Sequence, residues 1–260
     1  MKFWLQQTAW TMDKPKPYGI MHLSFFLGGM ILAFFTAYLL RRLSVRKRNY
    51  LILGIGIFLT LCEIFKQLFL YVIVNNYTYN WWYFPFQLCS VPMYLCLIIP
   101  WIKRKTIRTA VLTFLMDFSL LGGIMAFLEP SGLLYTYVVL TLHSFVWHII
   151  LVFLSCIIGF SEEGERSLRD FQKGLPVWGI TVFLAMLFNV LFHTYGNINM
   201  FYISPYKPCP QIFFNKIAEV LGNQMGIIIY LLCMLLGAFI CHSFFYWFHK
   251  LGGHHKQDKI

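Results

Sequence analysis

Long apolar runs, each of about 20 residues and separated by short polar segments, constrain this chain more than any other feature of its sequence. Of its 260 residues 59% are hydrophobic and only 12% are charged, about half the charged share of an average soluble domain. A helix of about 20 apolar residues crosses the hydrocarbon of a bilayer. The sequence therefore predicts an all-α polytopic membrane protein with about seven transmembrane helices. The expected spans are residues 20–40, 50–74, 82–102, 109–128, 137–160, 175–195 and 223–248.

The charges indicate how the chain is oriented. The formal net charge is +11, but the Lys and Arg residues gather in short clusters between apolar runs, above all in residues 41–48 and 103–108. This distribution follows the positive-inside rule and argues against nucleic acid as a partner. We therefore expect the N-terminus outside and the C-terminus in the cytoplasm. The layout is that of a multi-pass protein of the plasma membrane, which we expect to be bacterial.

We expect the whole chain, residues 1–260, to form a single membrane domain. Residues 1–18 are polar and aromatic, which is typical of an interfacial lead-in, and their broken apolar stretch does not fit a cleavable signal peptide. Residues 196–222 contain three prolines and form the longest segment between spans, so we expect an outer loop that acts as a lid or binding loop. Residues 249–260 form the expected cytoplasmic tail.

Titratable side chains are costly in hydrocarbon and are candidates for function wherever they occur there. At about 1.5 Å of rise per helical residue, most of them fall in the outer half of the expected bundle. These residues are His22, Glu63, Lys66, Cys89, His143, His148 and His193. Asp117, in the inner part of the fourth span, differs from this pattern, and we expect it to be an interhelical hydrogen-bond partner. The sequence thus predicts a polar site that faces outward.

Several of these residues also have a structural interpretation. Glu63 and Lys66 are three residues apart and can neutralise each other on one helix face, or they can hold a lipid headgroup. A membrane histidine usually forms an interhelical hydrogen bond. His143 and His148 are separated by about 140° around a helix, so they cannot both point fully into one pocket. His148 is the deeper of the two and shares its face with Ser144.

Cys89 has the most specific case for reactivity, because it lies in an aromatic stretch between two prolines. Pro85 suits the first turn of a helix and would place Cys89 near a helix N-terminus, where the partial positive charge favours a thiolate. Pro92 lacks an N–H group and would leave the carbonyl of Leu88 without its usual partner. We expect the resulting bend to make room for a substrate.

A thiolate that is activated by a histidine is a usual basis for covalent acyl transfer. In this hypothesis Cys89 is the nucleophile and His148 the general base, while His143 and His22 orient the reacting groups. Lys66, Gln87 and backbone N–H groups near Pro85 would stabilise the oxyanion. The seven cysteines show no metal-binding spacing, and we expect neither a metal nor a cofactor.

Four segments, in this order and spacing, resemble one family over nearly the whole chain. They are residues 19–22 (GIMH), 84–90 (FPFQLCS), 142–148 (LHSFVWH) and, more weakly, 197–202 (NINMFY). The layout is similar to that of the YwaF-like bacterial integral membrane proteins, which group with the eukaryotic transmembrane protein 164 family acyltransferases. The resemblance implies a multi-span enzyme that moves fatty acyl chains between phospholipids through a cysteine acyl-enzyme, with a histidine assisting.

The resemblance also bears on individual residues. It favours His148 as the catalytic histidine and adds Asn199 to the residues expected to bind substrate. The eukaryotic enzymes carry the reactive cysteine beside the proline, followed by a histidine, whereas Phe86 and Gln87 hold those positions here. The nearest cysteine, Cys89, lies about one turn further along the chain.

The function expected from the sequence is acyl transfer or hydrolysis on membrane phospholipids at an outward-facing intramembrane site. The alternative is a proton-coupled transporter or a small-ligand sensor that uses the same polar cluster, although the sequence shows no obvious inverted repeat. The lipid headgroup, the acyl chain, the acceptor and the oligomeric state stay open at this point.

Overall fold

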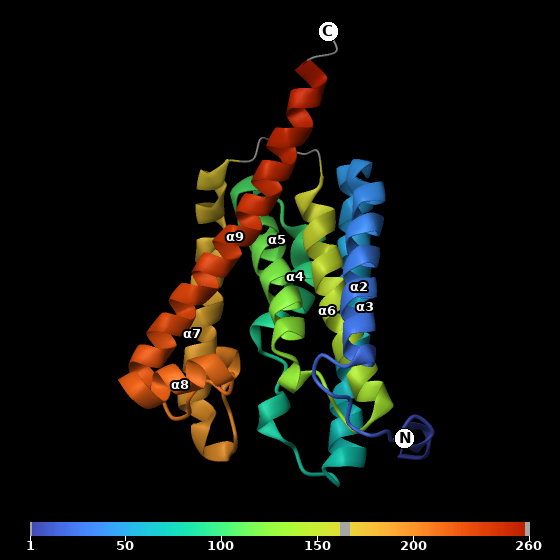
Figure 1. Ribbon diagram of the computed structural model, residues 1–260, viewed down its shortest axis with the longest axis vertical. Helices are drawn as coiled ribbons and strands as arrows, with labels where there is room; N and C mark the ends of the chain where they lie inside the picture. Colours follow the sequence, from blue (N-terminus) through green and yellow to red (C-terminus); the bar gives the residue numbers. More distant parts are fainter. Residues whose placement is uncertain (1, 162–166, 258–260) are drawn as a thin grey trace.

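The computed structural model describes residues 2–161 and 167–257, with side chains up to residue 251, and it confirms an all-α polytopic membrane protein. Six helices are long and apolar enough to cross a membrane: α2 (Ile20–Leu39), α3 (Val45–Phe69), α5 (Lys105–Leu128), α6 (Val138–Gly159), α7 (Leu175–Phe192) and α9 (Asn223–Gln257). A shorter apolar stretch, Leu88–Trp101, surrounds α4 (Val91–Ile98) and runs between the same two ends of the bundle. The chain ends therefore lie at opposite ends of the molecule (Figure 1).

Short elements connect and extend these helices. Two are α-helical, namely α1 (Lys2–Gln6) and α8 (Ile212–Leu221). The others are the π-helical turn η2 (Leu70–Val74) and the 3-10 turns η1 (Leu40–Arg42), η3 (Trp81–Tyr83), η4 (Leu88–Ser90), η5 (Ile99–Trp101), η6 (Pro130–Gly132), η7 (Leu168–Lys173), η8 (His193–Tyr195) and η9 (Met200–Tyr202).

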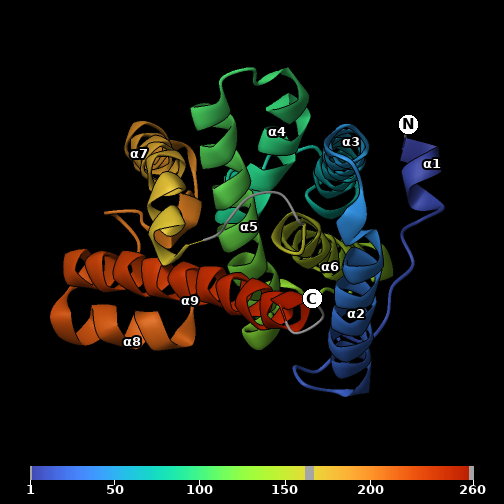
Figure 2. The same ribbon diagram turned by 90° about the horizontal axis from the view of Figure 1, so that it is seen from above.

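Helices α5 and α6 form the centre of the bundle. More than half of the apolar stretch of each is buried, at 61% and 56%, against 17–28% in the other four long helices, whose remaining surface is left for lipid. Helix α2 packs against α6, α3 against α4, and α9 against α5. Seen from above in Figure 2, α9 crosses the bundle obliquely, and α7 and α8 lie on the side away from α2 and α3.

The basic clusters lie at one end of the bundle. The α2–α3 and α4–α5 connections, which carry residues 41–48 and 103–105, are at the upper end in Figure 1, as is the C-terminal end of α9. The α3–α4 connection and the N-terminal segment lie at the opposite end, which we name the outer end after its predicted orientation. This one-sided arrangement agrees with the charge pattern, whereas the side that faces the cytoplasm stays a prediction.

The third span differs from its predicted extent of residues 82–102. Only 88–101 form a continuous helical stretch, which gives a rise of about 20 Å, short of the roughly 30 Å of a hydrocarbon core. Pro85 does not begin the helix, since the backbone on both sides of it is extended, with Phe84 at φ −54° and ψ 130° and Gln87 at φ −80° and ψ 162°. Pro92 lies in the first turn of α4 instead, so it starts a helix rather than bending one.

The non-helical segment that precedes Cys89, residues 84–87, lies at the outer end of the bundle under side chains of α7 and the outer loop. Irregular backbone at this depth is tolerated where protein covers it. The covering contacts are aromatic stacks with ring centroids 4.2 to 6.0 Å apart: Phe84 on Phe188, Phe86 on Phe201 and Trp82 on Tyr202. The outer loop therefore closes over the entrance to the third span.

The lead-in also has a fixed position. Leu5 of α1 is buried against Phe69 and Leu70 at the outer end of α3, while Trp4 and Trp10 are 74% and 71% exposed. Exposed tryptophans at this level suit the membrane–water interface, as expected for an interfacial lead-in.

Candidate active site

The last turns of α3 carry an ion pair. Lys66 Nζ lies 2.7 Å from Glu63 Oε2, and Glu63 is only 4% exposed. Gln67 Nε2 donates to Glu63 Oε1 at 2.7 Å and to the carbonyl of Tyr83 at 2.6 Å, which fixes the carboxylate against the non-helical segment. The expected pairing on one helix face is confirmed, and a role in holding a headgroup stays a prediction.

Cys89 lies in turn η4, directly before α4, and its side chain is partly exposed. In the part of the chain that the structure describes, no backbone carbonyl accepts from the N–H groups of Leu88 and Cys89, and the Cys89 N–H acts on its own sulfur. They are the unpaired donors expected at a helix start and can stabilise an oxyanion next to the thiol. Cys89 lies near a helix N-terminus, as expected, but the proline in the first turn of that helix is Pro92 and not Pro85.

Trp147 joins Cys89 to the histidines of α6. Its indole Nε1 donates to the carbonyl of Cys89 at 3.0 Å, and its ring stacks on His143 with centroids 5.4 Å apart and planes at 27°. Nε2 of His143 is buried and makes no hydrogen bond within the described chain. One tryptophan therefore fixes the backbone at the thiol and one face of a histidine.

His148 is oriented by its own helix. Its Nδ1 lies 2.7 Å from the carbonyl of Ser144, an acceptor, so Nδ1 carries the proton and Nε2 holds the lone pair. Within the described residues Nε2 makes no hydrogen bond, and the ring packs edge-on against Phe127 at 6.5 Å. This tautomer suits a general base.

The candidate catalytic residues of α3, η4 and α6 lie in one cluster. Lys66 is within electrostatic range of Cys89, His143 and His148, and the two histidines are within range of each other. In the described chain no hydrogen bond joins the sulfur of Cys89 to either ring, so the structure does not contain a closed thiol–imidazole pair. Catalytic hydrogen bonds are often long in ligand-free enzymes and tighten when substrate binds.

His22 lies apart from this cluster. Its Nδ1 accepts from the backbone N–H of Tyr18 at 3.3 Å, and its ring packs against Phe127 and Phe145 at 5.8 and 6.0 Å. Phe127 thus touches both His22 and His148, and this is the only connection that the described contacts give between them. A direct orienting role at Cys89 has no contact to support it.

Gln87 and Asn199 hold the outer loop in place. Gln87 Nε2 donates to the carbonyl of Asn199 at 3.0 Å, and its Oε1 accepts from the N–H of Phe201 at 2.8 Å. The Asn199 side chain in turn accepts from the N–H of Ser204 at 2.9 Å and donates to the carbonyl of Pro208 at 3.0 Å. Both amides are occupied by backbone groups. The second N–H of the Gln87 amide makes none of these contacts, and the oxyanion role expected of Gln87 stays a prediction.

Two tyrosines belong to the surroundings of the thiol and were not predicted. Tyr135, before α6, and Tyr202, in η9, both lie within electrostatic range of Cys89. Burial raises the pKa of each phenol, so both stay protonated and can donate a hydrogen bond. Tyr202 is the last residue of segment 197–202, which carries part of the family resemblance. That resemblance was the sequence signal that could have identified Tyr202 as a site residue.

A second buried polar pair lies in the inner half of the bundle. His242 of α9 faces the Asp117 carboxylate of α5 through Nδ1 at 3.0 Å and the carbonyl of Ser167 through Nε2 at 3.1 Å. The predicted interhelical role of Asp117 is confirmed. His242 was missed, although the depth test applied to the other histidines would have found it. Among residues 2–161 and 167–251, no three His, Cys, Asp or Glu side chains converge on a metal position.

The helices, the one-sided basic loops and the buried polar cluster define a multi-pass, all-α membrane protein. Within that class, the family model described as TMEM164 family matches residues 17–248. The chain belongs to this family, and the relationship inferred from the four sequence segments is confirmed. No curated protein matches the chain, and no solved structure matches it.

Proposed function

We propose that the protein is a thiol-dependent lipid acyltransferase or acyl hydrolase with Cys89 as its nucleophile. The observation that carries the proposal is the convergence of Lys66, Cys89, His143 and His148, from three elements, behind the irregular start of the third span. A thiol at the start of a helix, unpaired N–H groups beside it and a histidine with a free lone pair are the parts that acyl transfer requires.

The chemistry assigns a role to each group. A thiol in apolar surroundings ionises poorly, so Nε2 of His148 takes the Cys89 proton as the sulfur attacks the ester carbonyl of a lipid. The N–H groups of Leu88 and Cys89 stabilise the oxyanion, and Lys66 adds positive charge. The imidazolium then protonates the departing lysolipid, which leaves a thioester on Cys89. A second hydroxyl, from a lysolipid or water, gives its proton to His148 and attacks the thioester. The C–S bond then breaks, the acyl group stays on the hydroxyl oxygen, and the imidazolium returns the proton to the Cys89 sulfur.

His143 has a supporting role in this scheme. It stacks on the tryptophan that holds the Cys89 carbonyl, and it lies within electrostatic range of both Lys66 and His148. We propose that it orients Trp147 and contributes to the charge balance around His148. The outward orientation and the plasma membrane, both expected from the basic loops, would place this chemistry in the outer leaflet.

The test is intact-mass spectrometry of purified protein after incubation with mixed phospholipids, before and after neutral hydroxylamine. The wild type should carry a fatty-acyl mass increment that hydroxylamine removes, Cys89→Ser should carry none, and His148→Ala should form it at least tenfold more slowly. Cys62→Ser is the matched control, because Cys62 is also partly exposed and lies beside Glu63 on α3. It should behave as the wild type does.

Two results would count against the enzyme. One is full lipid acyl exchange by Cys89→Ser, and the other is the absence of any thioester in wild type and His148→Ala alike. Uptake of a solute into proteoliposomes that depends on a pH gradient, without lipid turnover, would favour the transporter alternative instead.

A further inference from the structure

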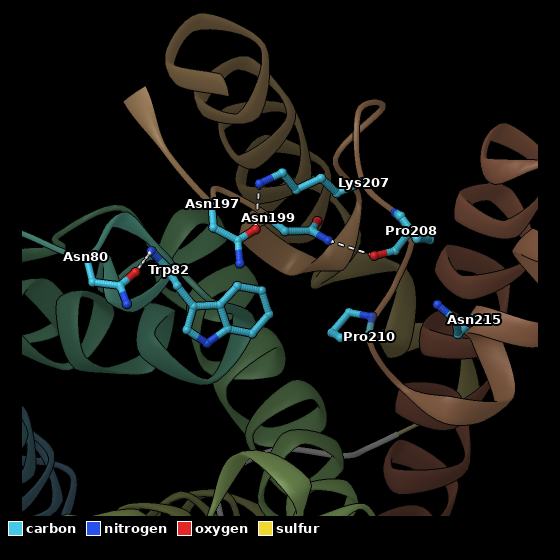
Figure 3. Close-up of a pocket in the computed structure, with 8 residues that line it drawn as sticks. All are labelled: Asn80, Trp82, Asn197, Asn199, Lys207, Pro208, Pro210 and Asn215. Atoms are coloured by element: carbon cyan, nitrogen blue, oxygen red, sulfur yellow. Dashed lines mark hydrogen bonds between the residues drawn. The ribbon is translucent and has the colours of Figure 1, made fainter. Parts of the chain in front are cut away.

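An outer pocket of about 490 Å³ lies between the α3–α4 connection and the outer loop (Figure 3). Two parts of the chain that are distant in sequence face each other across it. The α3–α4 connection supplies Asn80 and Trp82, and the outer loop and α8 supply the remaining wall. The lining residues on that second wall are Asn197, Asn199, Lys207, Pro208, Pro210 and Asn215.

The pocket is rich in unused hydrogen-bond donors. Asn80 Oδ1 accepts from the backbone N–H of Trp82 at 3.1 Å, and Asn197 Oδ1 accepts from Lys207 Nζ at 2.6 Å. Both side-chain NH2 groups therefore remain available, as does one N–H of Lys207, which also contacts the carbonyl of Gly196 at 3.4 Å. The indole N–H of Trp82 makes no hydrogen bond to a described residue. This set of donors fits a ligand made of acceptor oxygens.

The charge of the pocket is uncompensated. Lys207 is half-buried, and no carboxylate lines the pocket or lies within ion-pair distance of Lys207 in the described chain. One ammonium group with neutral amide donors around it is suited to a phosphate or phosphodiester. The lining carboxamides and prolines offer no anionic partner for an ammonium-bearing headgroup.

Helix α8 indicates that this ligand is a lipid rather than a free solute. Asn215 on α8 lines the pocket, while Ile212, Phe213 and Val220 on the same helix are 66%, 66% and 81% exposed. The helix lies crosswise at the outer end of the long helices (Figure 1). A short helix with this apolar surface lies in the headgroup region of a bilayer, so the pocket beside it is at headgroup level.

We propose that this outer pocket binds the phosphate of an anionic lipid headgroup, with Lys207 as its cation and Asn80, Asn197 and Trp82 as neutral donors. Trp82 forms the inner wall and stacks on Tyr202, which lies within electrostatic range of Cys89. A lipid whose phosphate occupies the pocket would direct its ester groups inward past Tyr202. The idea that this lipid is also the acyl donor of Cys89 rests on the proposed function. Binding of the lipid in the pocket does not depend on that function.

Native mass spectrometry of full-length Cys89→Ser protein in detergent measures binding without turnover. The probes are dioleoyl phosphatidylglycerol, dioleoylglycerol, which lacks the phosphate, and glycerol 3-phosphate, which lacks the chains. Lys207→Gln should raise the dissociation constant for phosphatidylglycerol about tenfold, the usual size of one charge-assisted hydrogen bond. Asn197→Asp, which places a carboxylate beside Lys207 at an exposed position, should weaken binding at least as much.

Lys216→Gln is the matched control, because Lys216 is an exposed lysine of α8 that does not line the pocket, and it should bind as the parent does. The proposal is overturned if Lys207→Gln and Lys216→Gln bind equally or if dioleoylglycerol binds as tightly as phosphatidylglycerol. It is also overturned if glycerol 3-phosphate alone matches the lipid, since the pocket is then a solute site.

The two proposals fail separately. Binding of phosphatidylglycerol that depends on Lys207, in a protein that never forms a thioester, would end the enzyme hypothesis and keep the lipid site. Thioester formation from phosphatidylglycerol that is unaffected by Lys207→Gln would support the enzyme hypothesis and end the proposal of a lipid site at Lys207.

Discussion

Replacing Gln87 by leucine tests how the outer loop is held over the third span. The side chain lies between two backbone groups of the loop, the carbonyl of Asn199 and the N–H of Phe201, at 3.0 and 2.8 Å. Both loop residues are buried, at 1% and 2% exposure. Leucine has a similar size but no polar atom, so Gln87→Leu leaves the N–H of Phe201 without a partner, whereas the carbonyl of Asn199 keeps the N–H of Tyr202 at 3.2 Å.

The magnitude follows from this geometry. A buried backbone group without a hydrogen bond costs about 1–3 kcal/mol, so the unpaired N–H of Phe201 costs about that much loop docking. Phe201 and Tyr202 also have positive φ values of 56° and 59°, which non-glycine residues adopt only when their surroundings hold them there. Loss of the clamp lets this segment relax, so even the lower value shifts local opening about 5-fold toward the open state.

Hydrogen–deuterium exchange of peptides that cover residues 196–204 measures this opening directly. Gln87→Leu should exchange these amides at least about 5-fold faster than wild type, and Gln87→Glu, which keeps the acceptor for Phe201, should show a smaller change. Gln172→Leu is the control, because Gln172 is exposed in η7 at the other end of the bundle. Unchanged exchange in Gln87→Leu would mean that the aromatic stacks alone hold the loop, and the clamp argument would be refuted.

Two further variants test packing and charge in the bundle. An added Cβ at Gly159 would fall against the ring of Phe245, which is fully buried, so Gly159→Ala should destabilise the protein by about 1–3 kcal/mol in thermal unfolding. Gly54→Ala, where nothing lies within 4 Å, should be neutral or slightly stabilising, and equal effects of the two would contradict the packing described. Asp117→Asn removes the carboxylate that faces His242 and should cost about 3–5 kcal/mol by the same assay, whereas an unchanged midpoint would show that this pair does not support the fold.

The sequence predicted the six long helices and most of their boundaries because hydrocarbon admits few alternatives. A backbone in lipid must satisfy its own hydrogen bonds, so each apolar run of sufficient length becomes a helix. The seventh span was predicted at residues 223–248, and α9 begins at Asn223. The third span was predicted too long, since apolar composition does not distinguish a helix from an irregular segment that neighbouring protein covers.

The same limit applied to the candidate site. Depth along each helix selected Glu63, Lys66, Cys89, His143 and His148, and the structure places the last three within electrostatic range of Lys66, the ion-pair partner of Glu63. It also selected His22, whose described contacts connect it to His148 only through Phe127. It also gave no warning that Gln87 is occupied, since its partners are backbone atoms more than 100 positions away.

The amino-acid sequence by itself therefore determined the class of protein, the family and the level at which polar groups gather, because these depend on hydropathy, charge placement and local motifs. Only the tertiary structure decided which side chains share a cavity. The pocket in Figure 3 is made by asparagines, a lysine and a tryptophan from two connections and α8. Asn197 and Asn199 fall in a segment that the sequence singled out, but the other lining residues are not distinctive, and together they form a site only because the outer loop folds back onto the start of the third span.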